Sequence, residues 1–534
     1  MDLLKLADIF YSLAVGKISL GTELQEIKIN NLEKQIFDLL MDVVKTKTPN
    51  TILRVAGGWI RDKLLGKESQ DIDISINNKT GEQFAHLVDQ YMQERGLPRK
   101  EITIVKANPE QSKHLATAMV HIFGIPIDFV NLRKETYAES RIPTAEFGTP
   151  EEDASRRDLT INALFYNINE GKVEDYVGGL EDLKNGIAKT PIDPLQTFID
   201  DPLRILRSTR FAAKYNLELD PDLIKAANDP RVQDAFKKKV SQERIWKELG
   251  GEKLEGGEWK AGFLSGPNPE RAARLLAQVG LRDILFGLSE EEKAELGITK
   301  GMTSFDVEQK NPHHDLTIWE HTLSVLEHLV KQETTTEQQK SGEDFLVRNL
   351  AALLHDIGKC DLCSRQSTEE GFHTYYGHAV SSAKIAEHVL RRMRAPLIVI
   401  KRVKKLIEEH MRLHTLAPDV SDKALRKFIK DMEDDWKNSV DLAISDAYGK
   451  MMDKQNPEIR KKYDEFAKRI DEIMKGLGGF KATSPLNGND LILLGFKPGP
   501  GIGQALKALH EQLLEKPNMT KEEALEFVKS LKLI

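Results

Sequence analysis

Residues 54–73 read RVAGGWIRDKLLGKESQDID, and this segment decides the first part of the fold. A β-type run ends in Gly57 and Gly58, and a helical pattern follows. Such a glycine turn lets backbone N–H groups approach a phosphate closely, and the helix N-terminus adds a favourable partial charge. Asp71 and Asp73 alternate within a second β-type run, so we expect both carboxylates on one face of a strand. The segment therefore predicts an anion-binding turn beside two carboxylates.

Carboxylate oxygens in this arrangement suit Mg²⁺, which usually takes one or two carboxylates together with substrate phosphates. Two such ions can activate an attacking hydroxyl and stabilise a leaving pyrophosphate. We therefore expect Asp71 and Asp73 to hold Mg²⁺ as the catalytic residues of nucleotidyl transfer. A D-x-D pair alone is more often a solvated strand edge, and it is the upstream G-G-x-x-R-D pattern that favours catalysis.

The rest of the N-terminal part alternates short β-type runs with helical ones. The strand candidates are TILRVAGG, DIDISI, EITIVKA, IPIDFVNL and ALFYNI. After about residue 186, long amphipathic segments with apolar residues at helical spacing follow. We expect an α+β fold, with a small mixed β-sheet head domain at 1–186. All-α regions then follow at 187–305, 306–455 and 456–534.

The segment RRDLTINALFYN, from Arg156, places Arg157, Asp158 and Asn162 near the start of an expected apolar helix. Guanidinium groups there could meet a triphosphate or a ribose. An N-terminal cap with flanking surface charge is the alternative. We therefore include these three residues among the candidates for nucleotide binding.

The segment DDPLRILRSTRF, from Asp200, predicts a helix with Asp201 as N-cap and Pro202 at the first helical position. Arg204, Arg207 and Arg210 follow at three-residue steps and fan over about a third of the helix circumference. An unpaired row of arginines would repel one another. We therefore expect these three side chains to converge on an anionic ligand.

A region from about 311 to 450 holds ten of the fourteen histidines. LLHDIGK places His355 and Asp356 side by side after an apolar run. A single histidine is usually a surface or satisfied core residue, but imidazoles together with carboxylates suit Mn²⁺, Fe²⁺, Co²⁺ or Ni²⁺. The other candidate ligands of this metal site are His321, His378, His410 and Asp446, whereas His313, His314, His373 and His414 fit neither site and are left as structural.

Composition limits the class of protein. With 534 residues, 40% hydrophobic and 30% charged, the chain has material for about three or four globular domains. The net charge of −7 excludes a generally basic nucleic-acid binder and leaves only local patches such as Lys237–Lys239. No stretch predicts a membrane span or a leader peptide. We therefore expect a cytoplasmic protein with no membrane partner, and leave open an organellar or nuclear copy.

The chain resembles the class II tRNA nucleotidyltransferases of the polymerase β superfamily. The motifs that carry the resemblance occur in the order of that family: GGWIRD with DID, RRDLTINAL, VGGLEDLKNG, DDPLRILR and SQERIWKEL. The resemblance implies that Asp71 and Asp73 bind metal, and that Asp201 and Arg204 face the base, because cytosine and adenine both offer an amino group beside an acceptor. The family usually shows Glu-Asp-x-x-Arg, and this chain has Asp200 in the first position. The implied nucleotide-binding positions are Gly58, Arg61, Arg157, Asp201, Arg204, Arg207 and Arg210.

The histidine set resembles the HD phosphohydrolase domain. The pattern of that domain is matched by His321, His355, Asp356 and Asp446. Binuclear members of the family have additional histidines, and these are matched by His378 and His410. The resemblance implies a metal-activated water that attacks a phosphoester, with Lys359 holding the phosphate. Its substrates would be 2′,3′-cyclic or terminal phosphates at damaged tRNA ends. The alternative is a metal-stabilised structural domain.

Together the two resemblances imply a template-independent CTP/ATP:tRNA nucleotidyltransferase. It would add the 3′-terminal CCA to the tRNA end and act as a monomer or a homodimer. The alternatives are a poly(A) polymerase, a partial CC- or A-adding enzyme, or a non-catalytic RNA-binding protein. We expect the loop that governs the change from C to A within Glu139–Thr149. The stretch Gly499–Gly503 resembles the C-terminal segment of the family. It would either bind a backbone phosphate of tRNA or serve only in the packing of the neighbouring helices.

Overall fold

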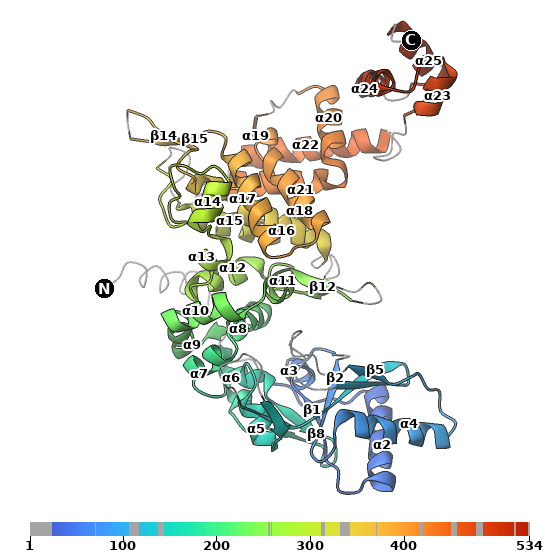
Figure 1. Cartoon of the computed structure of the whole chain (residues 1–534), viewed down its shortest axis with the longest axis vertical. Helices are drawn as coiled ribbons and strands as arrows, with labels where there is room; N and C mark the ends of the chain where they lie inside the picture. Colours follow the sequence, from blue (N-terminus) through green and yellow to red (C-terminus); the bar gives the residue numbers. More distant parts are fainter. Residues whose placement is uncertain are drawn as a thin grey trace. The chain divides into compact units, whose positions relative to one another are not determined.

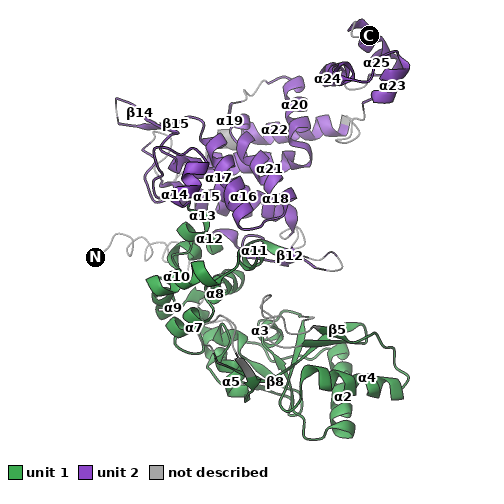
Figure 2. Ribbon diagram, in the orientation of Figure 1, with its two compact units in different colours: residues 1–251, 271–287 green, residues 252–270, 288–534 purple. Residues whose placement is uncertain are grey.

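The computed structural model describes residues 24–69, 71–105, 117–136, 144–254, 257, 259–310, 316–331, 342–369, 371–415, 420–449, 457–476, 484–516 and 519–531. The chain divides into two compact units (Figure 2). Unit 1 comprises residues 1–251 and 271–287, and unit 2 comprises residues 252–270 and 288–534. In the described residues, no helix is both long enough and apolar enough to cross a membrane.

Unit 1 contains a seven-stranded mixed sheet with the order β3-β4-β5-β2-β1-β8-β9 (Figure 1). Strand β2 pairs antiparallel with β1 and parallel with β5, which makes the sheet mixed as the sequence predicts. The strands are β1 Leu53–Ala56, β2 Ile72–Ile76, β3 Thr103–Val105, β4 Thr117–Ile122, β5 Ile125–Asn131, β8 Phe165–Asn167 and β9 Lys172–Glu174.

Helices α2 (Asn31–Lys47) and α4 (Gly81–Glu94) cover one face of this sheet (Figure 1). Phe84 of α4 packs edge-on against Phe129 of β5 with ring centroids 5.2 Å apart. A Cβ atom at Gly81 would lie 1.9 Å from the Phe129 carbonyl oxygen, so only glycine permits this close approach. The isoleucines of β2 are buried, and the alternate side chains of that strand lie on the opposite face.

The sequence analysis missed β4, although four of its five predicted strands match strands of this sheet and the fifth, EITIVKA, contains β3. Strands β4 and β5 form a tight hairpin around Phe123 and Gly124, which have φ values of 51° and 88°. A two-residue hairpin turn of type I′ has positive φ at both positions, and its usual signal is Asn-Gly or Asp-Gly. Phenylalanine in the first position carries no such signal.

The remaining elements of unit 1 are mainly helical. Short strands β6 (Arg133–Thr136) and β7 (Thr144–Phe147) form a separate hairpin, and β10 (Ile187–Ala188) pairs with β11 (Glu218–Leu219). The helices are α3 Gly58–Leu64, α5 Pro150–Ser155, η2 Thr160–Asn162, α6 Gly179–Asn185, α7 Pro194–Asp200, α8 Leu203–Tyr215, α9 Pro221–Ala227, α10 Pro230–Lys239, α11 Gln242–Gly250 and α13 Arg282–Phe286, with α12 Pro269–Gln278 running across the unit boundary.

Unit 2 is a helical bundle followed by a small C-terminal group of helices. The bundle comprises α14 Glu290–Glu295, α15 Ile318–Lys331, α16 Glu343–Leu354, η4 Ile357–Cys360, α17 His378–Arg392, α18 Leu397–Glu409, α19 Arg412–Thr415, α20 Asp422–Met432, η5 Glu433–Asp435, α21 Trp436–Gly449 and α22 Pro457–Gly476. The C-terminal group comprises α23 Gly488–Leu493, α24 Pro500–Glu515 and α25 Lys521–Ser530, which have a hydrophobic core of their own.

The expectation that everything after residue 186 is helical is wrong in detail. Besides β10 and β11, short pairs form from β12 (Gly251–Lys253) with β13 (Trp259–Ala261) and from β14 (Arg365–Ser367) with β15 (His373–Tyr375). Strands of two or three residues are too short to show an alternating pattern in sequence. They do not change the α+β class.

Candidate functional sites

Three carboxylates gather on the face of the unit 1 sheet opposite the buried isoleucines. The parallel register of β2 and β5 pairs Asp73 directly with Asp128, and Asp71 immediately precedes β2. Asp71 is exposed and Asp73 half-buried, whereas Ile72 and Ile74 are buried, as the predicted alternation requires. The Oδ1 atom of Asp128 is buried and has no hydrogen-bond partner among the described residues.

The electrostatics of Asp128 suit a cation site. Burial and, secondly, the charge of Asp71 raise the pKa of its carboxyl above the usual value. A bound divalent cation would relieve this repulsion and occupy the free oxygen. The donor set, which consists of carboxylate oxygens, fits the Mg²⁺ that the sequence predicts.

The glycine turn lies where the sequence predicts it, between β1 and α3. Gly57 has a φ of +73° and donates its N–H to the Leu164 carbonyl at 3.0 Å. A Cβ atom at Gly57 would stand 3.0 Å from Nη1 of Arg157. Gly58 begins the helix. The absence of a side chain at Gly57 therefore leaves room for the Arg157 guanidinium.

Arg61 of α3 is buried and connects three elements. It donates to the Asn162 side chain of η2 and, at 2.6 Å, to the Tyr215 hydroxyl of α8. The guanidinium also lies 2.9 Å from Asp62, and its carbon lies 4.3 Å from the Tyr215 ring centroid. These contacts orient α3 with respect to α8.

The second motif forms a network of charged groups. Arg157 binds Asp153 at 3.0 Å and the Asn162 carbonyl at 3.0 Å. Asp158 accepts from Asn162 Nδ2 at 3.0 Å and from Arg207 Nε at 2.8 Å. Burial would raise the pKa of Asp158, but the charges of Arg207 and Arg204 and the hydrogen bonds from Asn162 and Arg207 together outweigh burial and lower the pKa to about 2. The helix expected after Arg156 is only the short 3₁₀ turn η2, because β8 takes the following residues into the sheet.

The fourth motif differs from the sequence prediction in its cap. Pro202 is the N-cap of α8 and helical residues begin at Leu203, so the predicted start is one residue early. Asp201 still accepts from the Leu203 N–H at 3.3 Å, and its Oδ2 lies 3.0 Å from Nη2 of Arg244 on α11. Arg204 is buried and donates to the Arg156 carbonyl at 2.6 Å.

The arginine row on α8 is not the unpaired row that the sequence suggests. Glu248 of α11 accepts from Arg210 Nε at 2.6 Å and lies 3.5 Å from Arg207 Nη1. Arg207 also binds Asp158. Counter-charges from other elements thus hold this row, so repulsion among the arginines is no argument for an anionic ligand.

The second site lies in unit 2, where four histidines present the same tautomer. The Nδ1 atoms of His321, His355, His378 and His410 lie 3.1, 2.8, 2.8 and 2.6 Å from the carbonyl oxygens of Gly449, Ala352, Tyr375 and Ile407. A carbonyl can only accept, so each Nδ1 carries a hydrogen, and in a neutral ring Nε2 is then the nitrogen that presents a lone pair. A hydrogen bond from the other ring nitrogen to a carbonyl is the one that metal-bound histidines usually make.

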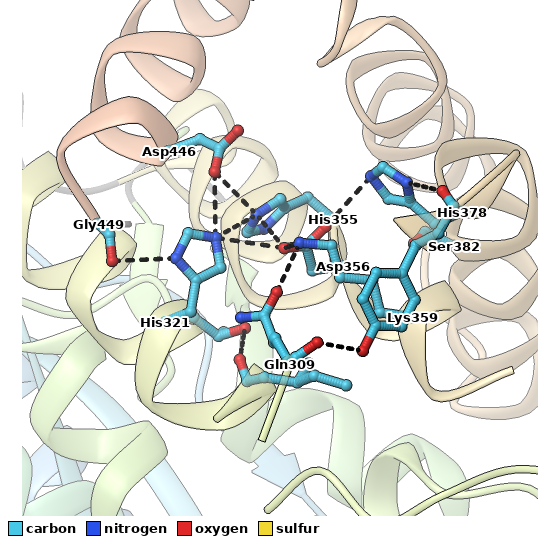
Figure 3. Close-up of polar contacts among 12 residues, drawn as sticks. Gln309, His321, His355, Asp356, Lys359, His378, Ser382, Asp446 and Gly449 are labelled. Atoms are coloured by element: carbon cyan, nitrogen blue, oxygen red, sulfur yellow. Dashed lines mark hydrogen bonds and ion pairs between the residues drawn. The ribbon is translucent and has the colours of Figure 1, made fainter. Parts of the chain in front are cut away.

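The Nε2 atoms converge with two carboxylates (Figure 3). His321 Nε2 lies 3.3 Å from His355 Nε2, 3.2 Å from Asp356 Oδ2 and 3.0 Å from Asp446 Oδ1. His378 Nε2 lies 3.4 Å from the other oxygen of Asp356. Two groups of possible metal ligands, one with His321, His355 and Asp446 and one with His378 and His410, therefore share Asp356.

The charges in this cluster also fit a metal site. Burial and, secondly, His355 lower the pKa of His410 to about 3, which keeps that ring neutral. Burial alone would lower the pKa of His355, but Asp356 and Asp446 together raise it to about 10, so without a metal this ring also carries a hydrogen on Nε2, which a bound metal would displace. The Nε2 atoms of His321 and His355 lie 3.3 Å apart, a distance that suits a shared hydrogen or one cation bound to both. The donor set of imidazole and carboxylate fits the transition metals that the sequence predicts.

Two further residues complete the surroundings of this cluster. Lys359 is buried, with its ammonium 2.7 Å from Asp356 Oδ2. The sequence analysis left His414 as structural, and the structure places its Nε2 2.7 Å from Asp446 Oδ2. His313 and His314, also left as structural, lie outside the described residues, as does part of the predicted loop Glu139–Thr149.

Comparison with known proteins assigns both regions. Residues 53–189 match the family described as Poly A polymerase head domain, and residues 318–472 match the HD domain. A mitochondrial CCA tRNA nucleotidyltransferase of Candida glabrata is 32% identical, over 96% of this chain and 97% of that protein. Its Saccharomyces cerevisiae counterpart is 31% identical, over 95% and 93%.

The chain belongs to the CCA tRNA nucleotidyltransferase family. A solved CCA-adding enzyme in complex with CTP has the same fold, with a TM-score of 0.58 and 21% identity over 94% of this chain and 96% of that one. The class II CCA resemblance read from the motifs is thereby confirmed, and so is the α+β fold class.

Sequence reasoning missed three residues that contact the predicted nucleotidyltransferase site. Asp128 lies inside a predicted strand, and only the strand register, which places it beside Asp73, identifies it as part of this site. Arg244 and Glu248 stood inside the quoted motif SQERIWKEL, but nothing in the sequence pairs them with α8. The nucleotide-binding roles of the predicted set remain predictions.

Proposed function

We propose that this protein uses CTP and ATP to add or repair the 3′-terminal CCA of tRNA. The observation that carries the proposal is the group of three carboxylates, Asp71, Asp73 and Asp128, on adjoining strands beside the Gly57 turn. The alignment of this chain with CCA tRNA nucleotidyltransferases over almost its whole length supports the same reaction.

The residues of unit 1 have different proposed roles in nucleotidyl transfer, according to their chemistry. Asp71, Asp73 and Asp128 would hold Mg²⁺, which when bound supplies charge neutralisation for the triphosphate and the attacking 3′ hydroxyl. The first N–H groups of α3, which follow Gly57, and the guanidinium of Arg157 would meet phosphate oxygens. Each of these groups is held by contacts of its own, so little reorganisation is needed when the nucleotide binds.

Base selection is assigned to Asp201 and Arg204. A carboxylate accepts from the amino group of cytosine or adenine, and a guanidinium donates to the ring acceptor beside it. Arg244 Nη2 donates to Asp201 Oδ2 at 3.0 Å and to Oδ1 at 3.4 Å, and the carboxylate keeps further lone pairs for the base. Uracil and guanine present a carbonyl at the matching position and would meet the carboxylate unfavourably.

Transcribed tRNA lacking its CCA end, offered CTP and ATP singly and together, tests this function. We expect two cytidines with CTP alone and complete CCA with both. Extension by many adenosines from ATP alone would identify a poly(A) polymerase, and a stop after CC with both nucleotides would identify a CC-adding enzyme. Binding of tRNA without pyrophosphate release would identify a non-catalytic binder.

Variants at the carboxylates separate catalysis from binding. Asp71→Ala with Asp73→Ala should abolish addition while tRNA binding persists. If the double variant still incorporates both nucleotides, the assignment of the active site is wrong. Both fungal relatives are named as mitochondrial, and we extend the proposal to a mitochondrial as well as a cytoplasmic location.

We also propose that the HD region is a metal-dependent phosphohydrolase. The observation that favours it is the convergence of four Nε2 atoms around the shared carboxylate Asp356. Metal bound there would lower the pKa of water and supply hydroxide for attack on a phosphoester. The substrates we assign are 2′,3′-cyclic and terminal phosphates of tRNA ends.

Asp356→Ala tests the second function within the full-length chain. We expect hydrolysis of 2′,3′-cyclic AMP in the presence of Ni²⁺ or Mn²⁺ to disappear, with nucleotide addition intact. A wild-type protein that binds the metal but hydrolyses no faster than Asp356→Ala would instead identify a structural metal site.

A further inference from the structure

Gln309 carries a buried amide donor next to the HD cluster. Its side chain is 1% exposed, and Nε2 has no hydrogen-bond partner within the described part of the chain. Its Oε1 accepts a bond of 2.9 Å from Lys359, whose ammonium lies 2.7 Å from Asp356 Oδ2 (Figure 3). One side chain therefore separates this amide from the carboxylate that the two metal-ligand groups share.

Chemistry decides which way the amide faces. A lysine ammonium offers only donors, so the amide oxygen must face it and the NH₂ group must face away. The main chain is held as well, because the Tyr375 hydroxyl donates to the Gln309 carbonyl at 3.0 Å and the His373 N–H donates to the Lys310 carbonyl at 2.8 Å. The NH₂ group is therefore fixed in position as well as buried.

A fixed and buried donor without an acceptor is uncommon, because nearly all such groups in folded proteins are hydrogen-bonded. Lys359 directs one hydrogen to Asp356 and one to Gln309, and the two amide hydrogens of Gln309 are further uncommitted donors beside it. The acceptor that an HD site brings to such a donor is a phosphoryl oxygen.

We propose, resting on the phosphohydrolase function above, that Gln309 Nε2 donates a hydrogen bond to a non-bridging oxygen of the phosphoester bound at the HD site. Gln309 is then a catalytic residue of that reaction, and Lys359 positions it. The side chain recognises a phosphoryl group as such, whether a cyclic diester or a terminal monoester carries it.

Gln309→Glu isolates the donor. The carboxylate has the same shape and accepts from Lys359 at least as well, so a purely structural Gln309 predicts unchanged hydrolysis. A contact with substrate predicts the opposite, because an oxygen anion then faces the phosphoryl oxygen. We expect KM for 2′,3′-cyclic AMP and the inhibition constant of inorganic phosphate to rise at least about tenfold.

The measurements use the full-length protein loaded with Mn²⁺, with metal content determined for each variant. Gln366→Glu, an amide-to-carboxylate change at an exposed position of β14, is the matched control and should leave both constants unchanged. Gln309→Met removes donor and acceptor together and should also weaken phosphate binding. Nucleotide addition by unit 1 serves as the measure of intact folding.

The outcomes distinguish a failure of the proposed Gln309 contact from a failure of the proposed phosphohydrolase function. If the wild type hydrolyses and Gln309→Glu binds phosphate and cyclic nucleotide equally well, the role of Gln309 is wrong and the hydrolase stands. If the wild type hydrolyses no faster than Asp356→Ala, the hydrolase is wrong. In that case calorimetric titration with phosphate still decides the contact: equal affinity of wild type and Gln309→Glu overturns it, and weaker binding by the variant supports it.

Discussion

Asp73 of β2 and Asp128 of β5 are paired side by side in a parallel register, so their carboxylates share one face of the sheet. Burial raises the pKa of the Asp128 carboxyl, and the negative charge of Asp71 raises this pKa further. Like charges in this arrangement are costly unless a cation neutralises them. The pairing therefore makes Asp128 part of the proposed nucleotidyltransferase centre.

Asp128→Asn keeps the size of the side chain and removes its charge. We expect the rate of CTP and ATP incorporation to fall by about 100-fold or more, the scale on which a group that stabilises transition-state charge acts. Nucleotide incorporation into CCA-less tRNA measures it. Asp89→Asn, which alters a carboxylate of α4 that pairs with Arg99 at 3.0 Å, is the control and should retain full activity. An active Asp128→Asn enzyme would remove Asp128 from the centre.

Arg244→Ala should impair the selection of nucleotides. Asp201 would lose the guanidinium that holds its carboxylate at 3.0 Å, and we expect KM for both nucleotides to rise about tenfold while KM for tRNA stays constant. Steady-state kinetics with each nucleotide measures the effect. Arg231→Ala breaks an exposed pair with Asp229 on α10 and should change neither value. If Arg244→Ala affected tRNA alone, Arg244 would have no part in nucleotide selection.

Asp158→Asn should lower stability in a pH-dependent way. The folded-state pKa of about 2 lies below the unfolded value of about 3.9, so the charged form stabilises the fold above pH 4 and this contribution disappears as the pH falls toward 2. The contribution is about 2 kcal/mol, which corresponds to an apparent Tm lowered by about 5 °C at neutral pH.

Thermal unfolding of wild type and Asp158→Asn from pH 7 to pH 3 measures this contribution. The difference in apparent Tm should be constant down to about pH 4 and shrink below it. A difference that grew as the pH fell would contradict the ion pair with Arg207 as its source.

Gly358→Ala should disturb the HD cluster without touching a metal ligand. A Cβ atom there would lie 2.4 Å from the His378 carbonyl oxygen and 2.5 Å from the Ser382 nitrogen, so η4 and α17 must move apart. We expect a cost of roughly 1–3 kcal/mol and weaker metal binding, because His378 moves away from Asp356.

Metal titration and thermal unfolding measure the effect of Gly358→Ala, and nucleotide addition should persist. Gly503→Ala is the matched control, since no heavy atom lies within 4 Å of a Cβ built at that position. Equal metal affinity in the two variants would show that the close contact of η4 with α17 does not position His378.

Much of both sites could be predicted from the sequence because their key spacings are short. The glycine turn, the alternating Asp71 and Asp73, and the adjacent His355 and Asp356 are local patterns whose geometry follows from strand and turn periodicity. The set of histidines could be proposed because imidazoles and carboxylates are uncommon together without a metal. These predictions concern residue types and near neighbours.

The predictions that failed concern elements distant in the chain. The helix expected after Arg156 did not form, since β8 pairs with β1 and draws those residues into the sheet. The row of arginines on α8 was expected to be unpaired, but Glu248 and Asp158 come from α11 and the second motif to neutralise it. Tertiary contacts override local propensity in both cases.

The amino-acid sequence alone determined which chemistry this chain can perform, because ligand types, short spacings and motif order are properties of the covalent chain. Tertiary structure alone decided which of those groups remain available, by bringing Asp128 beside Asp73 and Gln309 beside Lys359. The physical reason is that strand register and helix packing bring together residues far apart in the chain. A donor or acceptor is free for a ligand only when such packing has not already satisfied it.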